Sequence, residues 1–217
     1  MKKFELTAEF VTNFFGKKLF RIKALVAFGN VNAGELGGFV EKEENLSNDG
    51  NAWVYGNAEV YGNAEVYGNA RVYGNAEVYG NAEVYGNAWV YGNAEVYGNA
   101  EVYGNAEVYG NAEVYGNARV SGDAEVSGNA RVSGDAEVSG DAEVSVVKGF
   151  GRYFRTTTFF RCTDKVVRVQ CGCFYGDLPQ FRSIVKKTHG DGKLAKEYLA
   201  IADLMEFHFS DEEDADK

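Results

Sequence analysis

The sequence from Gly50 to Tyr67 reads GNAWVY GNAEVY GNAEVY, and this hexapeptide recurs sixteen times up to Ser145. A period of six does not suit an α-helix, because six residues advance about 600° and the position drifts from repeat to repeat. It suits a strand, in which Ala and Val point to one face while the residue between them and Tyr point to the other. Gly and Asn tolerate left-handed backbone angles and can turn the chain. The repeat therefore predicts short strands joined by regular turns.

A strand this short cannot bury its own Val, so the hexapeptides need one another. If three of them form a coil of 18 residues, stacked coils enclose Val and Ala and pair their backbones about 4.8 Å apart. Sixteen hexapeptides then give five and one third coils, a triangular prism roughly 25 Å tall. We expect an all-β solenoid, a parallel β-helix with three hexapeptides per coil.

The repeat resembles the hexapeptide-repeat class of left-handed parallel β-helix proteins, in which a small residue lies two places before each aliphatic one. Ala52 precedes Val54 in this way, and the pattern persists through the repeat. The left hand is implied by the resemblance alone. The flank GELGGFVE at 34–41, with NLS at 45–47, looks like a bacterial and prophage subgroup of these proteins (GGFVE…NLS…GNAxVYGNA). This second resemblance implies little about activity.

The chain divides into four segments. Residues 1–49 are expected to form an N-terminal β-hairpin cap from strands at 4–10 and 18–28, because an open β-helix end exposes unpaired edges and apolar core. Residues 50–147 form the β-helix. Residues 148–210 form a small α+β C-terminal cap domain, with strands in 149–174 and helices at 178–188 and 192–205. Residues 211–217 are an acidic tail.

The residue between Ala and Val varies, and residues 18 apart form three outer columns, mostly of Glu. The first column departs from this with Trp53, Arg71 and Trp89. Arg71 is a candidate cation–π sandwich, worth about 0.5–1 kcal/mol per face at an exposed site, or else an ordinary surface Arg. Stacked Glu repel by roughly 0.9 kcal/mol per pair in water. We interpret them as a solubilising face, with an acidic decoy that imitates nucleic acid as the alternative.

Tyr is the other outward residue in eleven hexapeptides, and Ser replaces it from Ser121 on. The Tyr columns run Tyr55, Tyr73, Tyr91 and Tyr109; Tyr61, Tyr79, Tyr97 and Tyr115; and Tyr67, Tyr85 and Tyr103. Stacked rings would stabilise the coil spacing. So much outward aromatic surface also fits self-association as a dimer or trimer, because Tyr is favoured at interfaces. The end that carries Ser could be where the C-terminal segment folds back.

Charge and composition narrow the functional classes. The net charge is −10, and the hexapeptides alone hold three Arg against fourteen Asp and Glu. Such a surface argues against a nucleic-acid-binding groove. No stretch approaches the roughly 18 apolar residues of a membrane span, and the start lacks the features of a secretory signal. We therefore expect a cytoplasmic protein, in the host-cell cytoplasm if it is phage-encoded, without a membrane partner.

The residues that could carry chemistry lie outside the repeat. Hexapeptide acyltransferases use a His as general base, but His189 and His208 both belong to the C-terminal segment. Three close Cys and the absence of an export signal indicate reduced thiols. Cys162, Cys171, Cys173 and His189 are a weak candidate for a zinc site, since they lack the Cys-x-x-Cys spacing. A Cys–His nucleophile pair is weaker still, and no cofactor is expected.

Our leading hypothesis is a non-catalytic structural or binding protein, associated with a prophage, that presents a rigid acidic and aromatic surface. Its partners would be itself or a host protein, and the candidate binding residues are Trp53, Arg71, Trp89, Tyr55, Tyr73, Tyr91 and Tyr109. One alternative is an acyltransferase-like enzyme. Another is an anti-defence inhibitor that acts as an acidic decoy or binds a small ligand.

Overall fold

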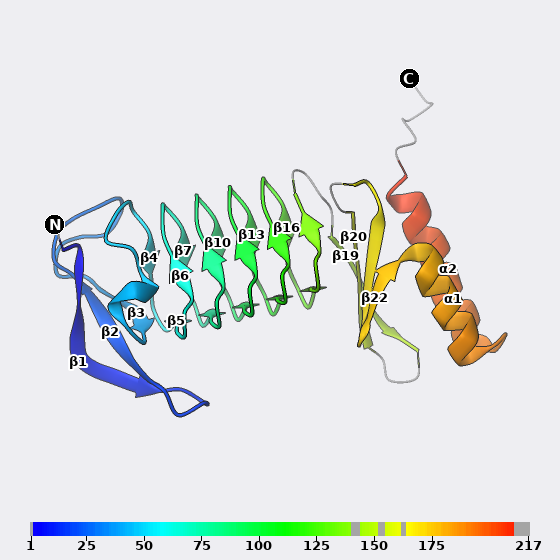
Figure 1. Cartoon of the computed structure of the whole chain (residues 1–217), viewed down its shortest axis with the longest axis horizontal. Helices are drawn as coiled ribbons and strands as arrows, with labels where there is room; N and C mark the ends of the chain where they lie inside the picture. Colours follow the sequence, from blue (N-terminus) through cyan, green and yellow to red (C-terminus); the bar gives the residue numbers. More distant parts are fainter. Residues whose placement is uncertain (1, 140–143, 152–154, 162–163, 211–217) are drawn as a thin grey trace, which may run out of the picture.

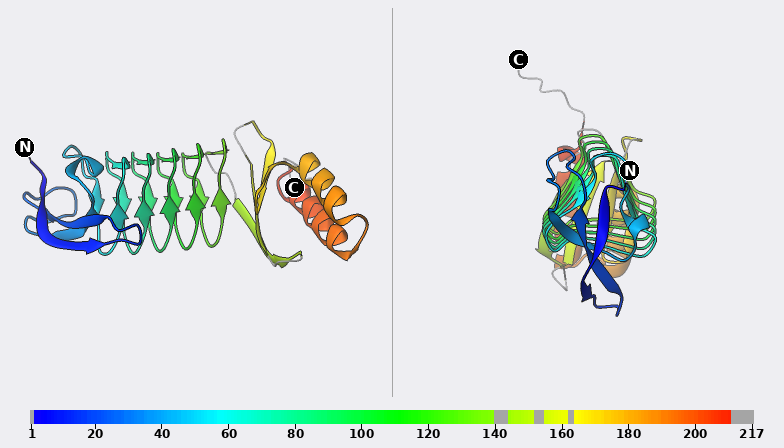
Figure 2. Two further views of the ribbon diagram at one scale, coloured as in Figure 1. Left: turned by 60° about the horizontal axis from the view of Figure 1, so that its bottom comes forward. Right: turned by 90° about the vertical axis from the view of Figure 1, so that its left-hand side faces the viewer.

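The computed structural model describes residues 2–139, 144–151, 155–161 and 164–210. A stack of parallel coils fills the middle of the chain, with strands at its N-terminal end and a small sheet with two helices at its C-terminal end (Figure 1). Seen end-on, the coils superimpose on one outline (Figure 2). The predicted all-β solenoid with an α+β C-terminal domain is confirmed, whereas the left hand stays a prediction.

Three parallel sheets form the sides of the solenoid, and each coil contributes one two-residue strand to each sheet. One sheet contains β4 (Trp53–Val54), β7 (Arg71–Val72), β10 (Trp89–Val90), β13 (Glu107–Val108) and β16 (Glu125–Val126). The second contains β5 (Glu59–Val60), β8 (Glu77–Val78), β11 (Glu95–Val96), β14 (Glu113–Val114) and β17 (Arg131–Val132). The third contains β6 (Glu65–Val66), β9 (Glu83–Val84), β12 (Glu101–Val102), β15 (Arg119–Val120) and β18 (Glu137–Val138).

Residues 18 apart pair across neighbouring coils, as the sequence predicts. Trp89 pairs with Arg71 on one side and with Glu107 on the other. The Val and Ala side chains of the hexapeptides are completely buried from Ala52 to Val138 and form one continuous core. Burying a Val side chain contributes about 1.5–3 kcal/mol. The interior column therefore supplies the main driving force for stacking, and the backbone hydrogen bonds fix its register.

Glycine is required at the turns for two reasons, which Gly86 illustrates. Its φ of 71° lies in the left-handed region, which costs other L-residues roughly 1–2 kcal/mol. A Cβ atom at this position would also lie 2.9 Å from the backbone nitrogen of Gly104 in the next coil. The close approach of successive turns therefore leaves no space for a side chain.

The N-terminal strands continue into the solenoid. β1 (Phe4–Thr12) and β2 (Lys18–Ala24) form the expected antiparallel hairpin, and β2 pairs with β3 (Leu36–Val40). β3 then pairs in parallel with β5, with Val40 beside Val60. After the short 3-10 helix Glu43–Asn45, Leu46 forms a bridge with Val66. The coil stack thus begins before the first hexapeptide.

The C-terminal domain is an antiparallel sheet covered by two helices. Its strands are β19 (Val144–Phe150), β20 (Arg155–Arg161), β21 (Val167–Cys171) and β22 (Phe174–Asp177), and its helices are α1 (Leu178–His189) and α2 (Lys193–His208). Asp177 and Gln180 form a capping box at the start of α1, which fixes where that helix begins. No described helix is long and apolar enough to cross a membrane.

The sheet of this domain lies against the last coils. Phe160 joins the solenoid core, while Phe159, its neighbour on β20, packs under the helices. The Ser133 hydroxyl donates to Oε1 of Gln170 at 2.8 Å, and the Tyr175 ring lies next to Gly134. The end of the repeat that carries Ser is therefore where the C-terminal segment folds back, and the small Ser side chain leaves the room that this contact needs.

Candidate binding surfaces

A lattice of Tyr and Glu side chains covers much of the outer face of the solenoid. The Tyr hydroxyl donates to the carboxylate of the Glu sixteen residues further on, at 2.7–3.3 Å. These pairs are Tyr61–Glu77, Tyr67–Glu83, Tyr79–Glu95, Tyr85–Glu101, Tyr91–Glu107, Tyr97–Glu113 and Tyr109–Glu125. The predicted ring stacking is confirmed from Tyr73 on in the first Tyr column and throughout the other two, where successive Tyr centroids lie 4.8–5.0 Å apart.

This lattice changes the acidity of the groups within it. Burial, and next the hydrogen bond to Glu101, raise the pKa of the Tyr85 hydroxyl to about 12. Burial and a Glu partner likewise raise the pKa of Tyr61, Tyr67 and Tyr79. The hydroxyls are therefore protonated donors over the physiological range. Tyr and Glu act here as one hydrogen-bonded surface, and not as separate sticky and acidic faces.

The edges of the prism carry a second ladder, made of Asn side chains. The amide of Asn51 donates to Asn69 at 3.0 Å, and the ladder continues through Asn87 and Asn105. It reaches Asp123, which accepts from Asn105 at 2.8 Å. Such ladders satisfy polar groups between stacked chains. The repeated outer surface is thus bonded within itself at both its faces and its edges.

The first column interrupts this lattice, because Arg71 and Trp89 take the positions where Tyr55 and Tyr73 would otherwise meet Glu. Among the described residues, neither of these two Tyr hydroxyls donates to a carboxylate. The Tyr73 ring instead meets Trp89 edge-on, with centroids 6.2 Å apart. Tyr91 and Tyr109 follow Tyr55 and Tyr73 in the Tyr column of the same face. They belong to the ordinary lattice and donate to Glu107 and Glu125.

Trp53 corrects the expectation of an exposed Trp–Arg–Trp sandwich. Its outward side chain is fully buried beneath the N-terminal residues, with Phe28 at 5.4 Å and Phe4 at 6.3 Å between ring centroids. The cap needs a large apolar surface to pack on, and Trp53 supplies it. Within the described residues, the cation–π contact of Arg71 is with Trp89 alone, where Cζ lies 5.4 Å from the ring centroid.

A cleft of about 420 Å³ opens at this interruption, lined by Asn30, Tyr55, Arg71, Tyr73 and Trp89. Four of the five lining residues come from the repeat, and Asn30 comes from the loop that follows β2. Burial raises the pKa of Tyr55, and the Arg71 charge partly counteracts that rise. Tyr55, Arg71, Tyr73 and Trp89 were candidate binding residues on the sequence alone. Asn30 was not, because only the tertiary fold brings its loop to the solenoid.

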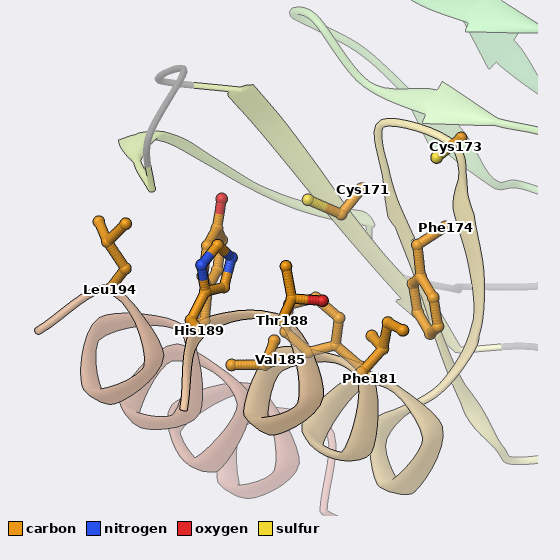
Figure 3. A pocket seen from close by; sticks show the side chains of 10 residues that line it. Cys171, Cys173, Phe174, Phe181, Val185, Thr188, His189 and Leu194 are labelled. Carbon is orange, nitrogen blue, oxygen red and sulfur yellow. The ribbon is translucent and has the colours of Figure 1, made fainter. Parts of the chain in front are cut away.

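The C-terminal domain holds a larger pocket of about 530 Å³ between its helices and the turn that joins β21 to β22. Figure 3 shows the side chains of α1, among them Phe181, Val185 and His189, on the side of that helix that faces the turn. Aromatic and aliphatic residues dominate the lining, to which Cys171 and Cys173 also belong. This pocket was not predicted from the sequence, although the apolar side of α1 was a signal for it.

The described residues do not bring the side chains of the candidate zinc site into a metal-binding arrangement. No group of three or more His, Cys, Asp or Glu side chains in that part of the chain is arranged to hold a metal. Cys162 lies outside the described residues. Cys171 ends β21 and Cys173 follows the turn residue Gly172, so the two do not share one strand face, and the Cys171 sulfur accepts from the Thr157 hydroxyl at 3.2 Å.

Both His residues lie in the C-terminal domain, away from the repeat. His189 ends α1 and stacks on the Tyr198 ring at 6.0 Å between centroids. His208 ends α2 and meets Phe209 edge-on at 4.8 Å. The solenoid itself therefore offers no imidazole for general-base chemistry.

Comparison with known proteins supports the repeat architecture. Residues 64–80 and 112–128 match the family model of the YdcK β-solenoid repeat. Each matched segment covers nearly one coil of the stack. No curated protein matches the chain.

Proposed function

We propose that this chain is a non-catalytic scaffold from a prophage, a rigid acidic and aromatic rod that binds a second copy of itself or a host protein. The observation that carries the proposal is the bonded outer lattice. Tyr, Glu and Asn side chains repeat along the coils and bond one another. Catalysis needs unique groups in a unique place, whereas a repeated surface suits an extended contact.

The first column is the face on which we expect the contact. Trp89 is 36% exposed, and the Tyr73 hydroxyl has no Glu acceptor there. An aromatic side chain with one polar end is the kind of residue that interfaces favour. The other two faces lack a Trp and keep their Tyr hydroxyls bonded over most of their length.

Light scattering over a range of protein concentrations tests self-association. Changing Tyr73, Tyr91 and Tyr109 to Ser should shift the mass toward the monomer. The matched control changes Tyr67, Tyr85 and Tyr103 to Ser on the third face and should not shift it. Ser is chosen because the repeat itself carries it from Ser121 on. A wild-type monomer at every concentration removes self-association, and capture of a stoichiometric host protein then tests the other partner.

Titration with coenzyme A tests the claim that the scaffold is non-catalytic. We expect no saturable binding, since the two His residues lie in the C-terminal domain and the solenoid has none. Saturable binding that is lost in His189→Asn would favour the acyltransferase alternative. An acidic decoy would instead be recognised by a host partner that is released as salt is raised.

A further inference from the structure

The three Arg residues of the repeat differ in whether they form ion pairs with Glu. Arg119 lies 3.3 Å from Glu101 and 3.5 Å from Glu137, and Arg131 lies 2.6 Å from Glu113. Arg71 has Trp residues on either side of it in its column, and within the described residues it forms no ion pair. Its guanidinium is therefore held on the Trp89 ring with its hydrogen-bond donors available.

The walls of the cleft suit a flat ligand. Trp89 and the half-buried Tyr55 and Tyr73 present aromatic surface around the guanidinium. The two Tyr residues and Asn30 also bring polar groups to the lining. Aromatic side chains pack on planar rings through offset or edge-on contacts. A volume of about 420 Å³ lies in the range of small-molecule sites.

The surrounding charge limits how negative the ligand can be. Arg71 is the single cation of the lining, Glu107 follows Trp89 in the same column, and Glu35 acts electrostatically on Tyr55. A polyanion such as a nucleic acid would meet repulsion from the Glu columns on every side. A carboxylate with a single charge matches the one guanidinium, which can bind it through two parallel hydrogen bonds.

We propose that the cleft formed by Asn30, Tyr55, Arg71, Tyr73 and Trp89 binds a small aromatic monocarboxylate. Arg71 pairs with the carboxylate, the aromatic residues hold the ring, and a Tyr hydroxyl or Asn30 reads a polar substituent. This site goes beyond the scaffold role, because it needs only one chain. Tyr73 and Trp89 also belong to the face on which we expect self-association, so ligand binding is measured at a concentration where light scattering shows a monomer. Failure of the ligand site is then distinguishable from loss of self-association.

The two Trp residues give a direct readout. In NMR spectra of ¹⁵N-labelled protein, 4-hydroxybenzoate should shift the indole signal of Trp89 saturably, while the signal of the buried Trp53 stays in place. Neutral 4-hydroxybenzamide should bind at least about tenfold more weakly, because it loses the charged pair with Arg71. Phenyl phosphate should also bind more weakly, since its second charge meets the acidic surroundings.

The chain supplies matched variants. Arg71→Glu restores the residue that most hexapeptides carry, so the coil should still form, and the Trp89 shift should disappear. Arg119→Glu makes the same change on another face and should leave the affinity unaltered. The proposal is overturned if Trp89 shows no saturable shift, if the benzamide or phenyl phosphate binds as well as the carboxylate, or if both Arg variants lose the ligand equally.

Discussion

At the scale of single residues, the ionised carboxylate of Glu59 is disfavoured by the fold. It lies between Phe39 and Glu77 in the second sheet. Burial, and next the charge of Glu77, raise its pKa. Folding therefore costs free energy while Glu59 is ionised. We expect Glu59→Gln to raise the free energy of unfolding at pH 7 by about 0.5–1 kcal/mol, the size of one stacked-Glu repulsion.

The pH dependence of this gain follows from the sign of the shift. A carboxyl with a raised pKa destabilises the folded state above that pKa, and the penalty vanishes below the unfolded value of about 4.5. Denaturant unfolding of both proteins should thus show the difference at pH 7 and lose it at about pH 3.5. Glu65→Gln, at an exposed position of the third column, is the control. An equal gain there would point to net charge and not to Glu59.

Two stacked Tyr residues, Tyr85 and Tyr103, allow the contribution of the hydroxyl to stability to be measured apart from that of ring stacking. Tyr85 donates to Glu101 at 3.0 Å, whereas Arg119 stands at the corresponding position for Tyr103. Their rings stack at 4.9 Å. Tyr85→Phe should lower the free energy of unfolding by about 0.5–1.5 kcal/mol, the net value of a hydrogen bond. Tyr103→Phe keeps the stacking and should change it by less than about 0.5 kcal/mol. Equal losses in chemical denaturation would mean that the Glu bond contributes nothing.

At the scale of the elements, two turns allow the cost of the backbone angle to be measured apart from the cost of crowding. Gly86 and Gly128 have φ of 71° and 66°, but a Cβ at Gly86 would press on Gly104, while one at Gly128 meets nothing within 4 Å. Gly128→Ala should cost about 1 kcal/mol for the angle alone. Gly86→Ala should cost a further 1–3 kcal/mol or so for the crowding. Denaturation midpoints check the order, and equal costs for the two variants would mean that crowding is unimportant.

The sequence predicted the elements better where the period of 18 holds. It gave the columns, the buried Val and Ala, and both helices, since these depend on local pattern. It missed that Val40 and Leu46 already occupy the inward column, six residues apart. Two extra residues between Leu46 and Val54 break the period, so each pairs 20 residues ahead and not 18.

The candidate site was predicted only in part, for a related reason. Columns of residues 18 apart placed Arg71 beside Trp89, but no column shows what a distant segment covers. Phe4 and Phe28 bury Trp53, and Asn30 reaches the cleft, through the path of the N-terminal strands. The Tyr–Glu bonds could have been predicted from the sequence. One coil is 18 residues, so the Glu sixteen residues after a Tyr lies in the next coil, two residues before the stacked Tyr and on the same face.

At the scale of the whole molecule, the Tyr lattice sets the response to alkali. Burial raises the pKa of Tyr61, Tyr67, Tyr79, Tyr85, Tyr91 and Tyr97 above the ordinary value of 10.0. Above pH 10 the unfolded chain therefore loses protons that the folded chain keeps. The stabilisation of the fold by these hydroxyls is complete below pH 10. It is lost as the pH rises through the folded-state pKa of each hydroxyl, which for Tyr85 is about 12.

Lys3 changes the free energy of unfolding in the opposite direction, over a lower pH range. Burial lowers its pKa to about 8 from 10.5, and its ammonium donates to the Ala52 carbonyl at 2.9 Å. Between those two values the unfolded chain binds the extra proton, so this group alone makes the fold more stable as the pH rises. The two effects together predict a stability maximum close to pH 10, followed by a decline.

The decline should be steep, because several hydroxyls contribute at once. Each can lower the free energy of unfolding by up to about 1.4 kcal/mol per pH unit, a value that solvent screening reduces for the more exposed rings. Denaturant unfolding at steps from pH 8 to 12, with the tyrosinate absorbance followed in parallel, measures both quantities. Tyr85→Phe should flatten the decline, because it removes one of the hydroxyls whose pKa the fold raises. Tyrosines that ionise near pH 10 while the fold persists would show that the lattice does not hold their protons.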